Sequence, residues 1–365
     1  MKAVVLAGGY ATRLRPITYA LPKLLFPVLG KPMIYWTLDL LRDFGVDEVV
    51  LGVNYLADRL HAVVGEKYGN MTVKYSLEDS PLGTAGPIKL ASQTTPMNET
   101  FVAMNGDIIT DINIAKMKQQ HEMKHAAITD ALYEVKDTRR FGVVQLTPDR
   151  RIQRFIEKPK LKDAPSHLIN AGIYMVQPEI LEMIPPGKKV SLEREIFPVL
   201  AREGRLCGFP ISGYWFDIGN IAEYRKANFQ LLKQRSPRSP LQENSAKVDV
   251  DAKVRVPAYF GESSEIESKA SAGPNVLIGK NSRLMKGAKV SNSVLFDNVT
   301  VGEGSIIQGA IVASDTTIGK RVIIGEGSVV SPHVQIHDAV RIGRNAIIHP
   351  FKEITSNIKN NAHAM

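Results

Sequence analysis

The chain has 365 residues, of which 44% are hydrophobic and 23% charged, so it can build a packed core and is too apolar to be a disordered protein. A single core stops growing at roughly 250–300 residues, which predicts two domains. The net charge of +9 suits a nucleic acid, an anionic membrane or a phosphorylated substrate and does not choose among them. Cys207 is the single cysteine, which excludes an intrachain disulfide and favours a reducing compartment. No apolar run approaches the roughly 20 residues of a membrane span, and no leader-like segment precedes the first strand, so we expect a cytoplasmic protein without a membrane partner.

Short β-branched runs alternate with helical patterns in the first 235 residues. We expect strands at 3–6, 48–53, 101–104 and 152–156 and helices at 33–44 and 114–124. Pro32 suits the first turn of the first helix, and Gly45 suits its C-terminal cap. This alternation predicts an open, largely parallel α/β sheet of Rossmann-like type, in which ligands bind at the carboxyl ends of the strands.

The hydrophobic period changes to six in the remainder of the chain. Aliphatic or small apolar residues recur from Val248 to Ile348, with two five-residue steps, one from Val290 to Leu295 and one from Ile307 to Val312. A small or β-branched residue, such as Ser282, Val294 or Ala346, follows four positions after most of these anchors and is expected to point inward beside them. A six-residue step cannot be helical; it describes one short strand and one turn of a three-sided parallel β-helix. The pattern spans about five coils and resembles the left-handed hexapeptide β-helix.

The change of period also predicts the domain bounds. Residues 1–235 form the α/β domain, 236–245 a polar, proline-containing linker, 246–355 the β-helix and 356–365 a C-terminal tail.

A glycine pair follows the first strand in the segment Leu6-Ala7-Gly8-Gly9-Tyr10-Ala11-Thr12-Arg13. Backbone N–H groups beside such a pair can approach a polyphosphate, and Arg13 and Lys23 supply fixed positive charge. The segment is neither a Walker loop nor a dinucleotide fingerprint. Taken alone, it is also compatible with a tight turn that carries solvated basic residues.

Two aspartates lie where chain direction changes. Asp107 follows an apolar strand and Gly106, which would turn its carboxylate toward the ligand crevice, and Asp217 occupies an aromatic-to-glycine transition. Two carboxylates together with phosphate oxygens make an all-oxygen site of the kind that Mg²⁺ prefers. A role for either aspartate in capping a turn or helix remains open at this stage.

The first 235 residues resemble the sugar-phosphate nucleotidyltransferases, whose signature is approximately GGxGTRLxPxT followed by PKP. The chain matches this signature at Gly8, Gly9, Thr12, Arg13, Leu14, Pro16, Thr18, Pro22 and Lys23 and departs from it at Ala11 and Leu24. Six further landmarks follow in order: Pro81–Gly86, Asn105–Asp107, Phe141–Val144, Glu157–Pro159, Asn170–Tyr174 and Trp215–Gly219. Together they make the resemblance far more specific than the glycine pair alone.

The resemblance implies transfer of a nucleotidyl group from an NTP to a sugar 1-phosphate, with Mg²⁺ as cofactor. The residues implied in catalysis are Arg13, Lys23, Asp107, Lys158 and Asp217, the metal ligands being Asp107 and Asp217. Those implied in nucleotide binding are Leu6, Ala7, Gly8, Gly9, Thr12, Arg13, Lys23, Glu78, Gly83, Thr84 and Asp107. Those implied in sugar-phosphate binding are Gly142, Glu157, Lys158, Asn170 and Gly172.

Glu78 indicates which nucleobase the NTP substrate carries. Thymidylyl and uridylyl relatives carry a glutamine near this position, whereas a carboxylate can accept two hydrogen bonds from the N1–H and N2–H₂ edge of guanine. GTP is therefore favoured, and the chain most resembles family members that guanylylate mannose 1-phosphate and carry a C-terminal β-helix.

Several alternatives remain open. Thymidylyl, uridylyl or adenylyl transfer to glucose 1-phosphate is the first. An acyltransferase that uses His333, His337 or His349 of the β-helix and a non-catalytic regulatory or scaffold subunit are the others. Nucleic-acid binding is disfavoured because no Lys/Arg block exceeds a doublet. The exposed faces and ends of a β-helix lead us to expect a homo-oligomer.

Overall fold

The computed structural model describes all residues, 1–365, and divides them into two units. The first unit contains residues 1–10 and 34–217, and the second contains residues 11–33 and 218–365. Residues 11–33, called the arm below, and helix α6 (Ile221–Arg235) thus group with the β-helix, although both precede the linker expected at 236–245. The nucleotidyltransferase signature therefore begins in one unit and continues in the other.

The first unit is built around a mixed ten-stranded sheet. Its strands are β1 (Lys2–Leu6), β4 (Glu48–Val53), β5 (Lys67–Tyr68), β6 (Met71–Leu77), β7 (Phe101–Asn105), β9 (Ile128–Glu134), β10 (Gly142–Leu146), β11 (Ile152–Glu157), β12 (Leu168–Val176) and β13 (Leu206–Pro210). The order is β11-β10-β12-β7-β1-β4-β6-β5, with β9 between β12 and β13. β1 pairs in parallel with β4 and β7, whereas β12 runs antiparallel to β7. The central strand β1 is apolar throughout its middle because both faces of the sheet are covered, and Val4 and Val5 are fully buried.

The helices of this unit are α1 (Met33–Phe44), α2 (Ala57–Val64), α3 (Gly86–Thr94), α4 (Ile114–Met123) and α5 (Phe197–Arg202), with shorter turns η4 (Leu161–Asp163), η5 (Pro178–Met183) and η6 (Leu192–Ile196). The strands and helices expected from the sequence are confirmed, as is the cap at Gly45, whose φ is +91°. The placement of Pro32 in the first helical turn is wrong, because Pro32 ends strand β3 (Lys31–Pro32) and the helix begins at Met33. No helix of the chain is long and apolar enough to cross a membrane.

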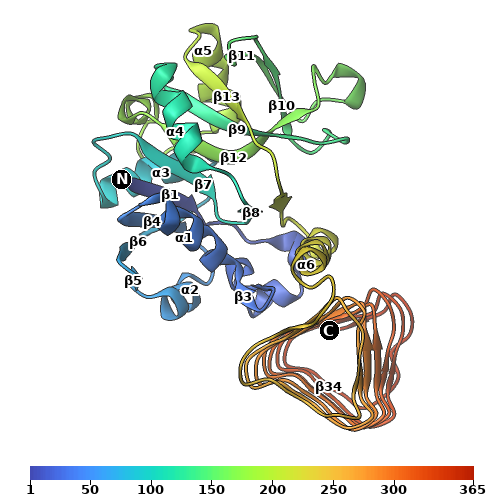
Figure 1. Cartoon of the computed structure of the whole chain (residues 1–365). Helices are drawn as coiled ribbons and strands as arrows, with labels where there is room; N and C mark the ends of the chain where they lie inside the picture. The colour runs from blue at the N-terminus through green and yellow to red at the C-terminus, as the bar shows by residue number, and fades with distance from the viewer. The chain divides into compact units, whose positions relative to one another are not determined.

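The second unit contains the predicted parallel β-helix, which has a triangular cross-section (Figure 1). Its eight-stranded face consists of β15 (Leu241–Gln242), β18 (Ala258–Phe260), β21 (Val276–Ile278), β24 (Ser293–Leu295), β27 (Ile311–Val312), β30 (Val329–Val330), β33 (Ile347–Ile348) and β35 (His363–Ala364). The seven-stranded face consists of β16 (Lys247–Val248), β19 (Glu265–Ile266), β22 (Arg283–Leu284), β25 (Thr300–Val301), β28 (Thr317–Ile318), β31 (Gln335–Ile336) and β34 (Glu353–Ile354). The six-stranded face consists of β17 (Lys253–Val254), β20 (Ser271–Ala272), β23 (Lys289–Ser291), β26 (Ile306–Gln308), β29 (Ile323–Ile324) and β32 (Arg341–Ile342).

The predicted hexapeptide anchors fill the interior of the β-helix. Ile278, Leu295, Ile318 and Ile342 are at most 2% exposed and belong to one apolar cluster along its axis. The sheets hold more strands than the five coils expected: the six- and seven-stranded faces lie wholly within residues 246–355, and β15 and β35 extend the eight-stranded face into residues 236–245 and 356–365. These two segments lack the regular six-residue pattern that marked the rest. The predicted domain bounds themselves stay predictions.

The arm has little regular structure. It contains the turns η1 (Thr12–Leu14), η2 (Ile17–Tyr19) and η3 (Lys23–Leu25) and the small hairpin of β2 (Pro27–Val28) and β3. Two further strands, β8 (Ile108–Thr110) and β14 (Trp215–Asp217), form an antiparallel ribbon in the first unit.

Candidate active site

The carboxyl ends of three parallel strands bring the glycine pair and the Asn105–Asp107 turn to one edge of the sheet. The last residue of β1, Leu6, lies opposite Gly52 of β4 and Asn105 of β7. The backbone continues this pairing, because Ala7 N–H donates to Gly52 O at 2.8 Å and Gly106 N–H donates to Leu6 O at 3.0 Å. Gly8, Gly9 and Asp107 therefore leave the sheet at one edge, where ligands of such sheets bind.

Glu78 joins this edge directly after β6. Its side chain is buried, and a Cβ on Gly8 would fall 2.6 Å from Glu78 Oε1, so the glycine allows the carboxylate to approach the loop. Glu78 Oε2 accepts from Leu82 N–H at 3.2 Å. Burial raises the pKa of Glu78 above its usual range, which that hydrogen bond only partly offsets. A buried carboxyl held beside the glycine pair is available to a nucleobase that donates hydrogen bonds.

Thr84 serves the protein framework. Its hydroxyl donates to Glu193 Oε2 at 2.6 Å and accepts from Leu192 N–H at 2.9 Å. The neighbouring Gly83 bridges Val190. These bonds tie the Pro81–Gly86 landmark to the turn η6, so the hydroxyl of Thr84 is already engaged within the chain.

The residues predicted for the sugar phosphate gather on β10, β11 and β12. Gly142 lies opposite Glu157, and Lys158 Nζ lies 3.2 Å from Glu157 Oε1. Lys158 adopts a φ of +50°, a strained conformation for a residue with a side chain, while its N–H donates to Phe141 O at 3.0 Å. The same conformation recurs in the β-helix, for example at Lys269 and Arg321, so at Lys158 it marks the sharp turn that ends β11.

Gly172, one of the residues predicted to bind the sugar phosphate, lies against Asn105 at the end of β7. It has a φ of +71°, and a Cβ at this position would fall 2.5 Å from Asn105 Nδ2. Its N–H donates to Asn170 Oδ1 at 2.7 Å, and Asn170 Nδ2 donates to Tyr174 Oη at 2.9 Å. The ladder between β12 and β9 is irregular in this segment, between Asn170 and Tyr174. Only glycine combines this backbone with such close contact to Asn105.

The two predicted metal ligands lie at one end of the β8–β14 ribbon, Asp217 as the last residue of β14 and Asp107 immediately before β8. β14 pairs with β8 so that Asp217 lies opposite Ile108, the residue after Asp107. No three His, Cys, Asp or Glu side chains of the chain gather as a closed metal cage. Mg²⁺ is usually held by one or two protein carboxylates, water and substrate phosphates, so Asp107 and Asp217 would suit this ion without a closed cage.

The structure also contains a cluster of three aromatic side chains, Tyr133, Phe141 and Trp215, which the sequence did not predict. Trp215 stacks on Tyr133 with ring centres 5.4 Å apart and meets the edge of Phe141 at 5.7 Å. Its Nε1–H donates to Ala171 O at 3.0 Å. The Trp215–Gly219 landmark pointed to the tryptophan, but no pattern around Tyr133 marked it.

Arg13, Lys23 and Thr12 belong to the arm and hence to the second unit. Arg13 lies in η1 with its guanidinium against Gly219, where a Cβ would fall 3.1 Å from Nη2. Ala11, the departure from the family signature, takes φ +43° and ψ +44°, the left-handed conformation that glycine adopts freely. The methyl group of Ala11 makes this conformation more costly than it would be for glycine.

A glycine loop, the buried Glu78 and the Asn105–Asp107 turn meet at the ligand-binding edge of an α/β sheet, an arrangement typical of a nucleotide-dependent transferase that acts on a phosphorylated substrate. The chain belongs to the nucleotidyl transferase family: the model described as "Nucleotidyl transferase" matches residues 2–234, and that described as "GMPPB C-terminal domain" matches residues 246–364.

Known relatives agree with this family. The chain is 36% identical over 245 residues to mannose-1-phosphate guanyltransferase of Yarrowia lipolytica, covering 66% of each protein. It is 34% identical over 286 residues to the enzyme of the same name from Schizosaccharomyces pombe, covering 77% of this chain and 74% of that protein. Among solved structures, HddC from Yersinia pseudotuberculosis aligns with a TM-score of 0.54 and 28% identity over 63% of this chain and 99% of the other.

Proposed function

We propose that this protein transfers a guanylyl group from GTP to mannose 1-phosphate, yielding GDP-mannose and pyrophosphate. The observation that carries the proposal is the meeting of Gly8, Glu78 and the Asn105–Asp107 turn at one sheet edge. The names of the two fungal relatives support the choice of sugar and base.

The reaction is an in-line displacement. A phosphate oxygen of mannose 1-phosphate attacks the α-phosphorus of GTP, a new P–O bond forms, and the bond to the leaving pyrophosphate breaks. The attacking phosphate is already an anion at neutral pH, so it needs no general base. Catalysis consists of aligning two anions that repel each other and neutralising the charge that develops on the leaving group.

Each predicted residue has a place in this scheme. Asp107 and Asp217 would hold a divalent cation, most simply Mg²⁺, which neutralises phosphate charge when bound. Lys158 would bind the phosphate of the sugar phosphate. Glu157 would accept hydrogen bonds from sugar hydroxyls, and Asn170 could both donate to them and accept from them. Arg13 and Lys23 would bind the triphosphate, a role that rests on the signature motif.

The buried Glu78 supports guanine over other bases, because a carboxylate meets only acceptors at the carbonyl edges of uracil and thymine. The β-helix histidines have structural partners: His337 lies 2.6 Å from Glu353, His333 stacks on Phe351 and His349 stacks on Tyr19. These contacts fit a structural role better than acyl transfer. Homo-oligomerisation and a cytoplasmic location remain predictions.

Pyrophosphate release measured with five nucleoside triphosphates against mannose 1-phosphate and glucose 1-phosphate tests the proposal. GTP with mannose 1-phosphate is expected among the best pairs; if it is not, the substrate assignment fails. Arg13→Ala and Asp107→Ala should each lower turnover at least about 100-fold while the thermal unfolding midpoint stays near that of the wild type. A rate like that of the wild type in either variant would overturn the catalytic assignment.

A further inference from the structure

One outer face of the β-helix differs from the other two. The outward side chains in the middle of its eight-stranded face are apolar and buried, including Tyr259 (7% exposed), Leu277 (2%) and Val294 (1%), whereas His363 at the end of the face is exposed. None of the three belongs to the internal core cluster. The outward residues of the other faces include exposed charges, such as Lys247 and Lys289. A buried apolar outer face must be covered by another segment of the chain.

The arm provides part of this cover. Pro27 and Gly30 lie beside Tyr259, Leu277 and Val294 around a gap of only about 10 Å³, which is at the lower limit of the space a water molecule needs. Gly30 has a φ of +74°, and a Cβ there would fall 2.0 Å from Tyr259 Oη. The arm and the β-helix are therefore packed as one core at this point.

An aromatic cluster fixes the same part of the arm. Phe26 of the arm, Tyr224 of α6 and Phe296 of the β-helix meet edge to face, with ring centres 5.5 to 5.9 Å apart, and all three are fully buried. Phe296 lies outside the internal core cluster, so its side chain serves this contact rather than the interior of the β-helix.

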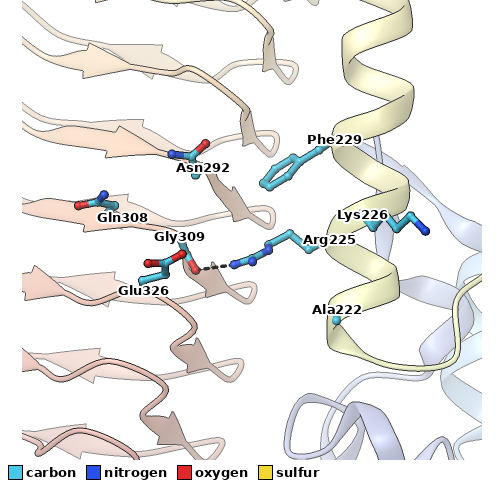
Figure 2. Close-up of a pocket in the computed structure, with 8 residues that line it drawn as sticks. All are labelled: Ala222, Arg225, Lys226, Phe229, Asn292, Gln308, Gly309 and Glu326. Carbon is cyan, nitrogen blue, oxygen red and sulfur yellow. Dashed lines mark hydrogen bonds between the residues drawn. The ribbon is translucent and has the colours of Figure 1, made fainter.

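Helix α6 adds hydrogen bonds that fix the backbone of the arm. Tyr224 Oη donates to Pro27 O at 2.5 Å, and Asn228 Oδ1 accepts from Leu29 N–H at 3.0 Å. The helix is itself tied to a coil corner, because Arg225 Nη1 donates to Gly309 O at 2.9 Å (Figure 2). Phe229 also points from α6 toward the coils in this view, whereas Lys226 points away from them.

A second contact holds the arm on the N-terminal side of Lys23. Tyr19 stacks on His349 of the β-helix with ring centres 5.9 Å apart, and the guanidinium of Arg15 lies 4.9 Å from the centre of the Tyr19 ring. Lys23 therefore lies between two points of attachment, Tyr19 and Phe26, and Arg13 precedes the first of them by six residues.

We infer that the β-helix is a positioning element of the nucleotidyl transfer reaction: it fixes the conformation of the arm, which carries Arg13 and Lys23, and Phe26, Tyr224 and Phe296 are positioning residues. This inference rests on the proposed role of the two basic residues. It assigns the apolar outer face of the β-helix a kinetic function in addition to a structural one.

Phe296→Leu in the full-length protein tests the inference, with Ile318→Ala as the matched control. Ile318 lies in the internal core, away from the arm, so its replacement also lowers stability without touching the arm. We expect Phe296→Leu to lower kcat/KM for GTP about tenfold, since small misplacements of binding groups cost this much or more, and to leave the KM for mannose 1-phosphate unchanged. Ile318→Ala should leave both constants near those of the wild type.

The outcomes separate the two proposals. The positioning role is wrong if kcat/KM for GTP falls no further in Phe296→Leu than in Ile318→Ala. It is also wrong if Phe296→Leu impairs the use of GTP and of mannose 1-phosphate equally. If Arg13→Ala measured alongside keeps the wild-type rate, the proposed function fails instead. Should Phe296→Leu not fold, Tyr224→Phe replaces it: this variant keeps the ring and removes only the hydroxyl bonded to Pro27 O, and it should show the same loss for GTP alone to a smaller extent.

Discussion

Replacement of Glu78 by glutamine tests the recognition of the base most directly. The carboxylate can accept two charge-assisted hydrogen bonds from guanine, and the amide replaces one acceptor with an N–H₂ that faces a guanine donor. A hydrogen bond to a charged group contributes about 1.5–3 kcal/mol. Losing about 2–3 kcal/mol lowers kcat/KM for GTP about 30- to 150-fold. The amide oxygen can still accept from Leu82 N–H, so the local fold is preserved.

The assay compares kcat/KM for GTP and UTP in the wild type, in Glu78→Gln and in the control Asp79→Asn. Asp79 is the exposed neighbour of the buried Glu78, and its substitution removes the same charge from the surface. We expect Asp79→Asn to behave like the wild type and Glu78→Gln to shift its preference toward UTP. An unchanged ratio of GTP to UTP efficiency in Glu78→Gln would refute the assignment.

The pH dependence provides a second readout for the same residue. Burial raises the pKa of Glu78, and guanine needs the ionised form. The KM for GTP should therefore rise as the pH falls through this raised pKa in the wild type, and this rise should be absent in Glu78→Gln.

Two further predictions concern other buried residues, Gly172 and Asp130. Gly172→Ala places a methyl group on a backbone with a φ of +71° and presses it against Asn105, so it should cost about 1–2 kcal/mol of folding free energy. It should also raise the KM for mannose 1-phosphate more than the KM for GTP. An unchanged thermal unfolding midpoint would contradict this contact. Asp130 is fully buried with no hydrogen-bond partner on either carboxylate oxygen, and burial raises its pKa well above its usual range. Folding therefore favours the protonated acid, so its contribution to stability is full below the unfolded pKa of about 3.9 and declines as the pH rises toward the folded pKa. Asp130→Asn should accordingly gain about 1–3 kcal/mol relative to the wild type at pH 8 and less at pH 5, as measured by thermal unfolding at both pH values.

The sequence was most informative where one physical signal dominated. β1 and β4 are buried β-branched runs, and Ile278 and Ile342 belong to a six-residue period that only a β-helix satisfies. The β8–β14 pairing places Asp217 opposite Ile108, the residue after Asp107, although the sequence separates the two acids widely and marks them only by their local context.

Contacts that depend on distant segments could not be predicted. The prediction that Val294 points inward is wrong. The five-residue step from Val290 to Leu295 changes the alternation of side chains, so Leu295 points inward and Val294 lies under the arm. Apolar residues occupy both the strand positions that the arm covers and the positions inside the β-helix, so the local sequence does not distinguish the two. The same holds for Tyr133 beside Trp215.

The division of the chain into two interleaved units has a consequence for biosynthesis. The arm is made almost at once, but the partners that hold it are among the later residues; Leu29 and Asn228, for example, are 199 residues apart. Contacts of such high sequence separation form slowly. A nascent chain therefore exposes its phosphate-binding signature long before the surface that orders it exists, and we expect nucleotide affinity to arise only when the coils around Phe296 have left the ribosome.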